Sequence, residues 1–122
     1  MLFQKKNKSK IGFFIIHGFL GNGRTAFGNL PAILLKNGIK EYKIVEVQGH
    51  GETEDINDFN AQKAIDQIEV EYVEYSEKFD ETYLLGFSMG GALATHLAAK
   101  YGADKLFLIA PAIKYGGPKR VG

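Results

Sequence analysis

The hydrophobic residues of the chain fall into short runs, and amphipathic segments separate these runs. Each run is rich in branched or aromatic side chains and is bounded by glycine or polar residues, as is typical of buried strands. We therefore predict four strands, at residues 11–16, 43–47, 82–87 and 105–110. The intervening segments repeat their apolar residues at helical spacing, which predicts three helices within residues 25–38, 60–79 and 89–102.

Glycine residues mark the ends of two of the predicted helices. Gly38 follows the first helix and Gly102 follows the third, and glycine is common just past the C-terminus of a helix. The second helix, within residues 60–79, has an apolar face opposite a set of acidic residues. We interpret these acidic residues as a face exposed to water.

Strands and helices alternate along the chain, and this order predicts the α/β fold class. The expected fold is a mostly parallel sheet of about four strands with helices on both faces. The sequence shows no internal repeat or linker, so we treat residues 1–122 as a single domain. In such sheets, ligands bind beyond the carboxyl ends of the strands. Three of the predicted strands end there in loops with candidate functional residues, HGFLGNG, QGHGE and GFSMGG.

One serine lies in a pattern that is typical of nucleophilic catalysis. Residues Gly86 to Gly90 fit G-x-S-x-G, and the pattern lies between a predicted strand and a predicted helix, as the motif requires. We expect Gly86 and Gly90 to let the chain turn sharply and hold Ser88 in a strained conformation at the strand tip. The helix that begins there would point its N-terminal amides toward a developing oxyanion.

Composition and charge narrow the classes of partner. The 122 residues carry a formal net charge of +1, which argues against nucleic acid or an anionic membrane as a partner. No apolar run has the length of a membrane span or of a signal peptide, and there is no cysteine, so a cytoplasmic location is expected. There is no phosphate-binding loop motif, and three scattered histidines do not make a metal-site pattern, so no cofactor and no metal are implied.

These motifs resemble those of the α/β-hydrolase family, in particular its small carboxylesterases and monoacylglycerol-lipase-like enzymes. The resemblance covers residues 11–112 and rests on FFIIHGFLGN, VQGHGE, LLGFSMGG and LFLIAPA, which follow the order of the family. It implies Ser88 as nucleophile, with the backbone N–H groups of Met89 and Phe19 as oxyanion-hole donors. Leu20 remains an alternative to Phe19. The apolar residues around Ser88 favour a small-molecule acyl ester as substrate.

The sequence departs from the family where the catalytic base and its acid are expected. Family members place an Asp or Glu and then a His after the last of the strands seen here. After Ser88 the only histidine is His96, about 12 Å along the helix at a rise of 1.5 Å per residue. The only later acid is Asp104, which we expect in a turn at the opposite edge of the sheet. His17 and His50 lie at the predicted site edge, and we assign both to structural roles in their loops.

The simplest interpretation is that the chain is the N-terminal part of a serine hydrolase, without the lid, the last strands and the catalytic acid and base. The strand at residues 105–110 is apolar on both faces yet would lie at the edge of the sheet, so we expect self-association through this open edge. As given, the chain is expected to be inactive.

Two functional hypotheses remain open. The first is a serine hydrolase acting on carboxylic esters, although thioesterases, C–C hydrolases and peptidases share the serine motif. The second is a non-catalytic domain, either a ligand-binding or an interaction module that has the fold without the chemistry.

Overall fold

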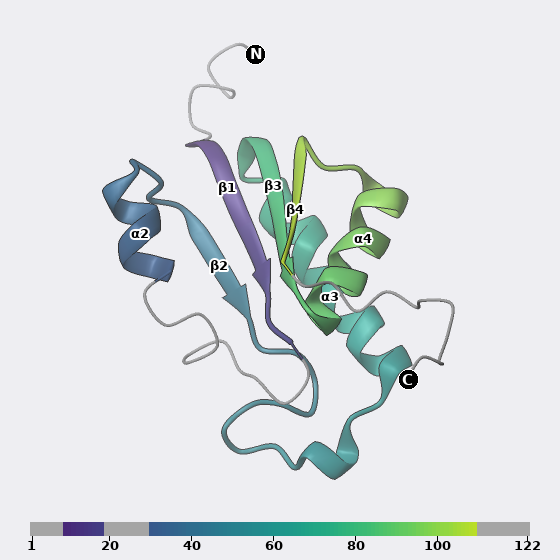
Figure 1. The fold of residues 1–122 in the computed structure, drawn as a ribbon. Helices are drawn as coiled ribbons and strands as arrows, with labels where there is room; N and C mark the ends of the chain where they lie inside the picture. Colours follow the sequence, from purple (N-terminus) through teal and green to yellow (C-terminus); the bar gives the residue numbers. More distant parts are fainter. Residues whose placement is uncertain (1–8, 19–29, 110–122) are drawn as a thin grey trace, which may run out of the picture.

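The structure is a computed structural model that describes residues 9–18 and 30–109 (Figure 1). The strands in these residues are β1 (Ser9–Ile16), β2 (Tyr42–Val45), β3 (Phe79–Phe87) and β4 (Lys105–Ile109). The helices are α2 (Leu30–Lys36), α3 (Ala61–Ser76) and α4 (Met89–Tyr101), together with the short 3-10 helix η1 (Ile56–Asp58).

The four strands are parallel and lie in the order β2-β1-β3-β4, which confirms the predicted fold class. β1 and β3 form the centre of the sheet, paired from Ser9 opposite Phe79 to Ile16 opposite Gly86. Parallel strands share one carboxyl edge. The loop after β2 and the turn between β3 and α4 therefore meet at the same end of the sheet, which is the lower end in Figure 1.

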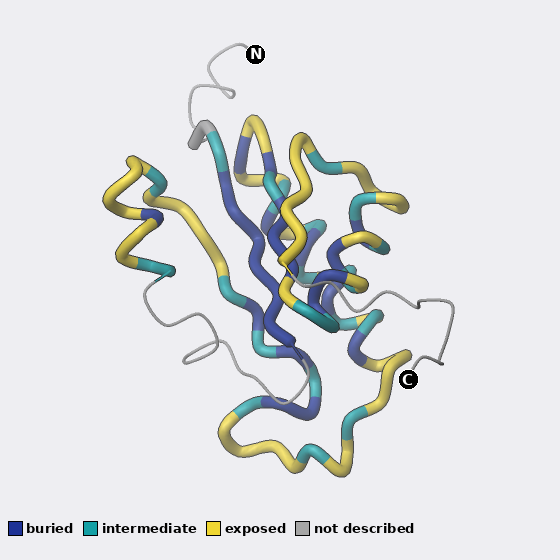
Figure 2. Tube along the Cα trace, in the orientation of Figure 1, coloured by how far each residue is buried: buried dark blue, intermediate teal, exposed yellow. Residues whose placement is uncertain are grey.

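Helices pack on both faces of the sheet, because side chains along a strand alternate between its faces. Phe14 and Ile16 of β1 point into the core formed with α3 and α4. Phe13 and Ile15 point the other way and cluster with Leu34 of α2. Figure 2 shows that β1 and most of β3 are buried, so the centre of the sheet holds the elements that lead into the candidate site.

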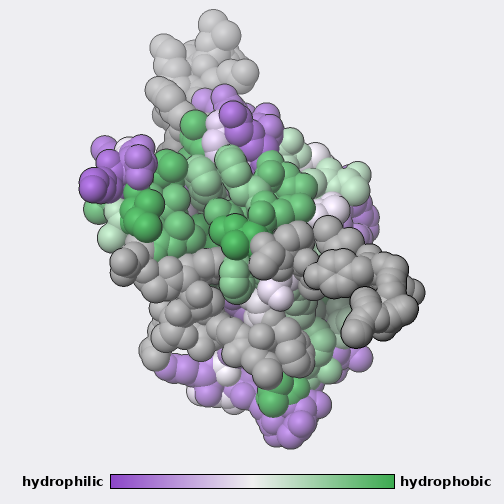
Figure 3. All heavy atoms as spheres, in the orientation of Figure 1, coloured by the Kyte–Doolittle hydropathy of each residue, from purple (hydrophilic) through white to green (hydrophobic). Residues whose placement is uncertain are grey.

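β4 forms an edge of the described sheet and is exposed along its whole length (Figure 2). Its four apolar residues are each between 37% and 45% exposed: Leu106, Phe107, Leu108 and Ile109. Figure 3 shows apolar side chains gathered over the face of the sheet between α2 and β4. An exposed apolar edge strand presents unpaired backbone groups that another strand can bind.

Several predicted strand boundaries differ from the structure: β1 begins at Ser9, two residues early, and β2 begins at Tyr42, one residue early. β2 ends at Val45, two residues early, because the chain enters a loop in which the N–H of Gln48 donates to Gln67 of α3. β3 begins three residues early, at Phe79, because it pairs with the whole of β1. Asp80 and Glu81 lie in this added part. Because their side chains are polar, the sequence there lacks the apolar run that predicts a buried strand.

The acidic residues of α3 are not simply a face exposed to water. The side chain of Glu69 is 16% exposed, and it accepts hydrogen bonds from Lys100 and Tyr101 and contacts His96, all on α4. For Glu69 the sequence interpretation is wrong, because this carboxylate joins α3 to α4, whereas Asp66 and Glu74 are exposed as expected. Within residues 9–18 and 30–109, no helix combines the length and the apolar character needed to cross a bilayer.

Candidate active site

Ser88 lies at the turn between β3 and α4, and its backbone is strained. Its φ is 57° and its ψ is −118°, and among the described residues it is the one non-glycine residue with a positive φ. Such a conformation costs on the order of 1 to 3 kcal/mol and persists only where its surroundings enforce it. Here the Ser88 N–H donates to Ile109 O at 3.0 Å, and Ser88 O accepts from the Gly91 N–H at 2.8 Å.

The glycines beside Ser88 act differently from our expectation. Neither Gly86 nor Gly90 has a positive φ, so neither supplies the turn conformation. Each instead allows two backbone segments to approach: a Cβ on Gly86 would clash with the backbone of Gly90, and one on Gly90 would clash with the carbonyl oxygen of Ile16. A Cβ on Gly18 would lie 3.1 Å from the Ser88 Cβ. The glycines therefore let α4 press against the carboxyl end of β1.

His17 is fully buried at the end of β1, and both of its ring nitrogens are engaged. Nδ1 lies 2.7 Å from Gly18 O, and Nε2 accepts the backbone N–H of Val47 at 3.1 Å. This pattern requires a neutral imidazole that carries its proton on Nδ1. Burial lowers the pKa of His17; the bond to Gly18 opposes this effect and the nearby His50 reinforces it. The arrangement matches the structural role that we assigned to His17.

The loop after β2 brings His50 beside His17, with ring centroids 5.2 Å apart. His50 is 8% exposed, its Nδ1 lies 3.2 Å from Gln48 O, and its ring meets the Phe59 ring edge to face. The two histidines thus pack against each other where the carboxyl ends of β1 and β2 meet. This packing agrees with a loop role for His50.

Two glutamines hold that loop in place. The Gln48 N–H donates to Gln67 Oε1 at 2.6 Å, and the side chain of Gln67 donates to Glu46 O at 2.7 Å. The side-chain amide of Gln48 donates to Asp58 O and accepts the N–H of Asn60, each at 2.9 Å. The sequence analysis did not predict these hydrogen bonds of Gln48 and Gln67. Gln48 stands within the QGHGE motif, but nothing local in the sequence marks Gln67 on α3 as its partner.

His96 and Asp104 lie away from the Ser88 turn, as the sequence predicted. His96 Nε2 is 2.6 Å from Glu69 Oε2, which joins α4 to α3 on the surface. Asp104 Oδ2 accepts the Thr82 N–H at 2.8 Å just before β4 begins. Because β3 and β4 are parallel, that end of β4 is opposite to the edge with Ser88.

Met89, the first expected oxyanion-hole donor, directly follows Ser88 as the first residue of α4. Its amide therefore belongs to the first turn of a helix, where backbone N–H groups carry partial positive charge. Phe19, the second expected donor, and its alternative Leu20 lie outside the described residues. In the part of the chain that the structure describes, no three or more His, Cys, Asp or Glu side chains are grouped to hold a metal ion.

A model of a hydrolase family, described as serine aminopeptidase S33, matches residues 7–121 of the chain. The chain belongs to the α/β-hydrolase family. This result confirms the resemblance seen in the motifs. In this α/β hydrolase, the Ser88 turn lies at the carboxyl edge of the sheet.

Solved structures and a curated relative extend the comparison. A structure reported for LipS and LipT, two metagenome-derived lipolytic enzymes, has a TM-score of 0.75 at 24% identity, over 91% of this chain and 46% of that chain. An esterase from Exiguobacterium antarcticum has a TM-score of 0.62 at 24% identity, over 86% and 39%. Protein phosphatase methylesterase 1 of Candida albicans is 26% identical over 106 residues, which are 85% of this α/β hydrolase and 29% of the relative. The chain thus spans less than half the length of these proteins.

Proposed function

We propose that Ser88 is the nucleophile of a serine hydrolase that acts on carboxylic esters. The observation that carries the proposal is the Ser88 backbone, with a φ of 57° at a strand-to-helix turn on the carboxyl edge of the sheet. A serine strained in this position presents its hydroxyl above the sheet, next to the N-terminal amides of a helix. The ester chemistry is supported by the lipolytic enzymes, esterase and methylesterase to which the chain is similar.

In the proposed reaction, Ser88 Oγ attacks the carbonyl carbon of the ester while a base takes the hydroxyl proton. The backbone N–H groups of Met89 and Phe19 donate to the oxyanion. The bond to the alcohol oxygen then breaks, and the alcohol leaves with the proton. Water attacks the acyl-enzyme, releases the carboxylic acid and restores the Ser88 hydroxyl.

We also propose that the base and its orienting acid come from sequence beyond these 122 residues. His17 has both ring nitrogens in hydrogen bonds, and His96 contacts Glu69 on the surface of α4. A genomic reading frame that continues with an Asp or Glu and then a His after further strand patterns would support this. A stop codon directly after Gly122 would refute it.

Labelling with a fluorophosphonate tests the role of Ser88. This reagent phosphonylates a serine that is activated as a nucleophile, and mass spectrometry of the digested protein locates the adduct. In the protein expressed from its complete reading frame, we expect the adduct on Ser88, its loss in Ser88→Ala, and its retention in the control Ser76→Ala. Equal labelling of the Ser88→Ala protein would remove Ser88 from the mechanism.

The choice of substrate separates the reaction subclasses that share the serine motif. p-Nitrophenyl esters of short or medium acyl chains should be hydrolysed faster than acyl thioesters or aminoacyl p-nitroanilides. Ser88→Ala should lower ester turnover by several orders of magnitude, because the groups of a catalytic triad act as a unit. Faster release from the anilide would favour a peptidase instead.

A non-catalytic ligand-binding or interaction domain is the second candidate. The hydrogen bonds at both ring nitrogens of His17 favour this candidate. They leave the histidine on the strand next to Ser88 without a free nitrogen to act as the base. Failure of the complete protein to react with the fluorophosphonate, together with retained ester binding, would select this alternative. In both cases we propose a small-molecule ester ligand and, from the lack of cysteine, a cytoplasmic location.

A further inference from the structure

A polar pocket lies at the end of the sheet opposite to Ser88. Its volume is about 300 Å³, near the lower end of the range for small-molecule sites. It is formed where α3 and α4 end and where β4 begins. The lining residues are Tyr72, Ser76, Thr82, Tyr101, Gly102, Ala103 and Asp104.

The hydrogen atoms of most lining hydroxyl groups are already donated elsewhere. Tyr72 donates to Gly102 O at 2.7 Å, Ser76 donates to Val73 O at 3.0 Å, and Tyr101 donates to Glu69 at 3.2 Å. These hydroxyl oxygens keep their lone pairs, so toward the pocket they act as acceptors.

Two backbone N–H groups of the lining are also donated elsewhere. The N–H of Gly102 donates to Ala98 O, and the N–H of Asp104 donates to Thr82 O, each at 2.9 Å. Asp104 Oδ2 accepts the Thr82 N–H, and the described residues give Asp104 Oδ1 no hydrogen bond. The pocket therefore offers mainly acceptors to a ligand.

The charges of the pocket have one sign. Asp104 is the one charged residue among the seven that line it, and the 13-residue helix α4 ends there with the negative end of its dipole. Lys100, in the last turn of α4, does not line the pocket: its ammonium group lies 3.1 Å from Glu69 Oε2 and 5.4 Å from the centroid of the Tyr101 ring. Burial, and next the charge of Asp104, raises the pKa of Tyr72 to about 12, so this hydroxyl stays neutral.

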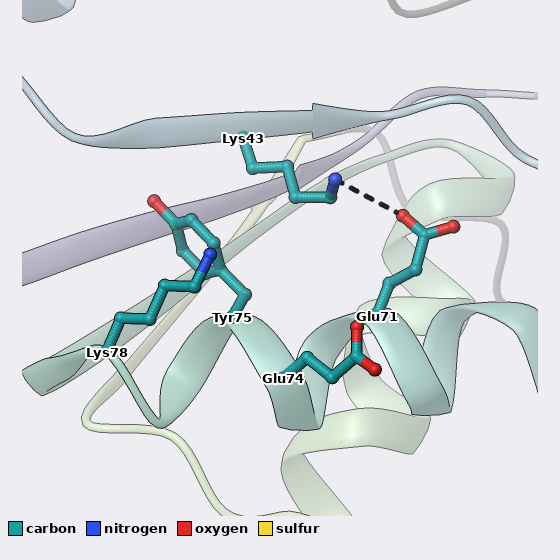
Figure 4. Close-up of a pocket in the computed structure, with 5 residues that line it drawn as sticks. All are labelled: Lys43, Glu71, Glu74, Tyr75 and Lys78. Carbon is teal, nitrogen blue, oxygen red and sulfur yellow. Dashed lines mark ion pairs between the residues drawn. The ribbon is translucent and has the colours of Figure 1, made fainter.

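A second hollow on the described surface shows the contrast. It has a volume of about 70 Å³, and it is lined by Lys43, Glu71, Glu74, Tyr75 and Lys78 (Figure 4). Lys43 Nζ lies 3.5 Å from Glu71 Oε1, so charges of both signs already meet there. Because this small hollow is lined by both basic and acidic side chains, it favours no ligand of either charge. The pocket beside Asp104 differs, since Asp104 is the one charged residue that lines it.

We propose that the pocket beside Asp104 binds a compact organic cation through an ammonium or guanidinium group. Such a group has only donors, which match the lone pairs of Asp104, Ser76 and the Gly102 carbonyl. The ring of Tyr72 supplies aromatic surface beside the cation, while the Tyr101 ring, 6.4 Å from it between centroids, already has Lys100 over its face. The site is independent of Ser88, and the proposal does not depend on the proposed hydrolase activity.

Titration of the full chain with methylguanidinium, followed by amide NMR, tests this site. We expect saturable shifts at the amides of Gly102 and Ala103 and none of comparable size at Ser88. N-methylurea has a similar shape without the charge, and it should bind at least tenfold more weakly. Equal responses to the two compounds, or a response that never saturates, would overturn the proposal.

Three variants locate the binding. Asp104→Asn removes the charge but keeps a side-chain oxygen that accepts the Thr82 N–H, and it should weaken methylguanidinium binding at least tenfold. Ser76→Leu fills the pocket without altering the charge or the bond to Thr82, and it should abolish binding. The control Asp66→Asn makes the same charge change on the exposed face of α3 and should leave affinity unchanged. Affinity retained in Ser76→Leu, or lost equally in Asp66→Asn, would refute the site even if Asp104→Asn fails to fold.

Discussion

The Nε2 atom of His17 accepts a hydrogen bond from the backbone N–H of Val47, at 3.1 Å. This bond joins the end of β1 to the loop after β2, and it requires a neutral ring. Protonation would turn Nε2 into a donor and leave two N–H groups facing each other. The folded state therefore resists protonation of His17, in agreement with the pKa that burial lowers.

This relationship predicts a loss of stability in mild acid. The pKa of His17 is below 6.5 in the folded state and near 6.5 in the unfolded state, so the unfolded state binds more protons between these values. The contribution of His17 is complete above pH 6.5 and decreases as the pH falls toward the folded-state pKa. His17→Gln keeps an acceptor for Val47 without a titration, so it should reduce the change in unfolding free energy between about pH 5 and about pH 7. Urea unfolding at several pH values measures this change. If the unfolding free energy varied with pH equally in the parent protein and in His17→Gln, the neutral state assigned to His17 would be contradicted.

Gly90 should tolerate no side chain, because its Cβ position is occupied by the backbone of β1. Gly90→Ala would clash with Ile16 O, and we expect it to lower the free energy of unfolding by about 3 kcal/mol. The matched control is Gly38→Ala. Gly38 has a φ of 83° but no atom near its Cβ position, so this change should cost about 1 kcal/mol. Equal losses in a denaturant titration would show that the close approach at Gly90 costs no more than the unfavourable φ at Gly38.

Relieving the backbone strain at Ser88 should raise the free energy of unfolding by a measurable amount. Ser88→Gly allows the same φ of 57° without the cost of a Cβ, whereas Ser88→Ala keeps that cost. We expect the glycine variant to exceed the alanine variant by about 1 kcal/mol in unfolding free energy. Both changes remove the hydroxyl, so the comparison isolates the backbone. An alanine variant of equal or greater stability would show that the turn is not strained.

The open edge at β4 should cause the 122-residue chain to self-associate. Leu108 is 38% exposed on this strand, and a charge there should oppose edge-to-edge pairing. Size-exclusion chromatography over a range of concentrations should show assemblies for the parent chain and a shift to monomer for Leu108→Lys. Val70→Lys makes the same change at an apolar residue of α3 that is 59% exposed, and it should not alter the elution. A monomeric parent chain at all concentrations would end this proposal.

The sequence predicts the elements of this fold better than it predicts their contacts. Runs of apolar residues located the four strands, because burial of a central strand requires continuous hydrophobicity. The start of β3 was missed, since Asp80 and Glu81 are polar and only the pairing of Phe79 with Ser9 makes this segment a strand.

In the candidate site, too, the sequence predicts the local feature better than the contacts between distant segments. A local motif marks Ser88, and its strained backbone follows from that motif. The role of Gly90 and the bond between His17 and Val47 depend on segments that are distant in sequence, so no local pattern reveals them. Reading Gly90 as a turn residue was reasonable from its neighbours alone. Its actual role is visible only once α4 lies against β1.

The position of β1 at the centre of the sheet has a consequence for biosynthesis. Among the four described strands, β1 is synthesised first, yet its main partner is β3, which cannot form until the chain has been made to Phe87. Until then, β2 is the one described strand that β1 can pair with. Folding must therefore wait for a pairing between distant segments, which slows it and leaves an extended apolar segment accessible to chaperones during translation.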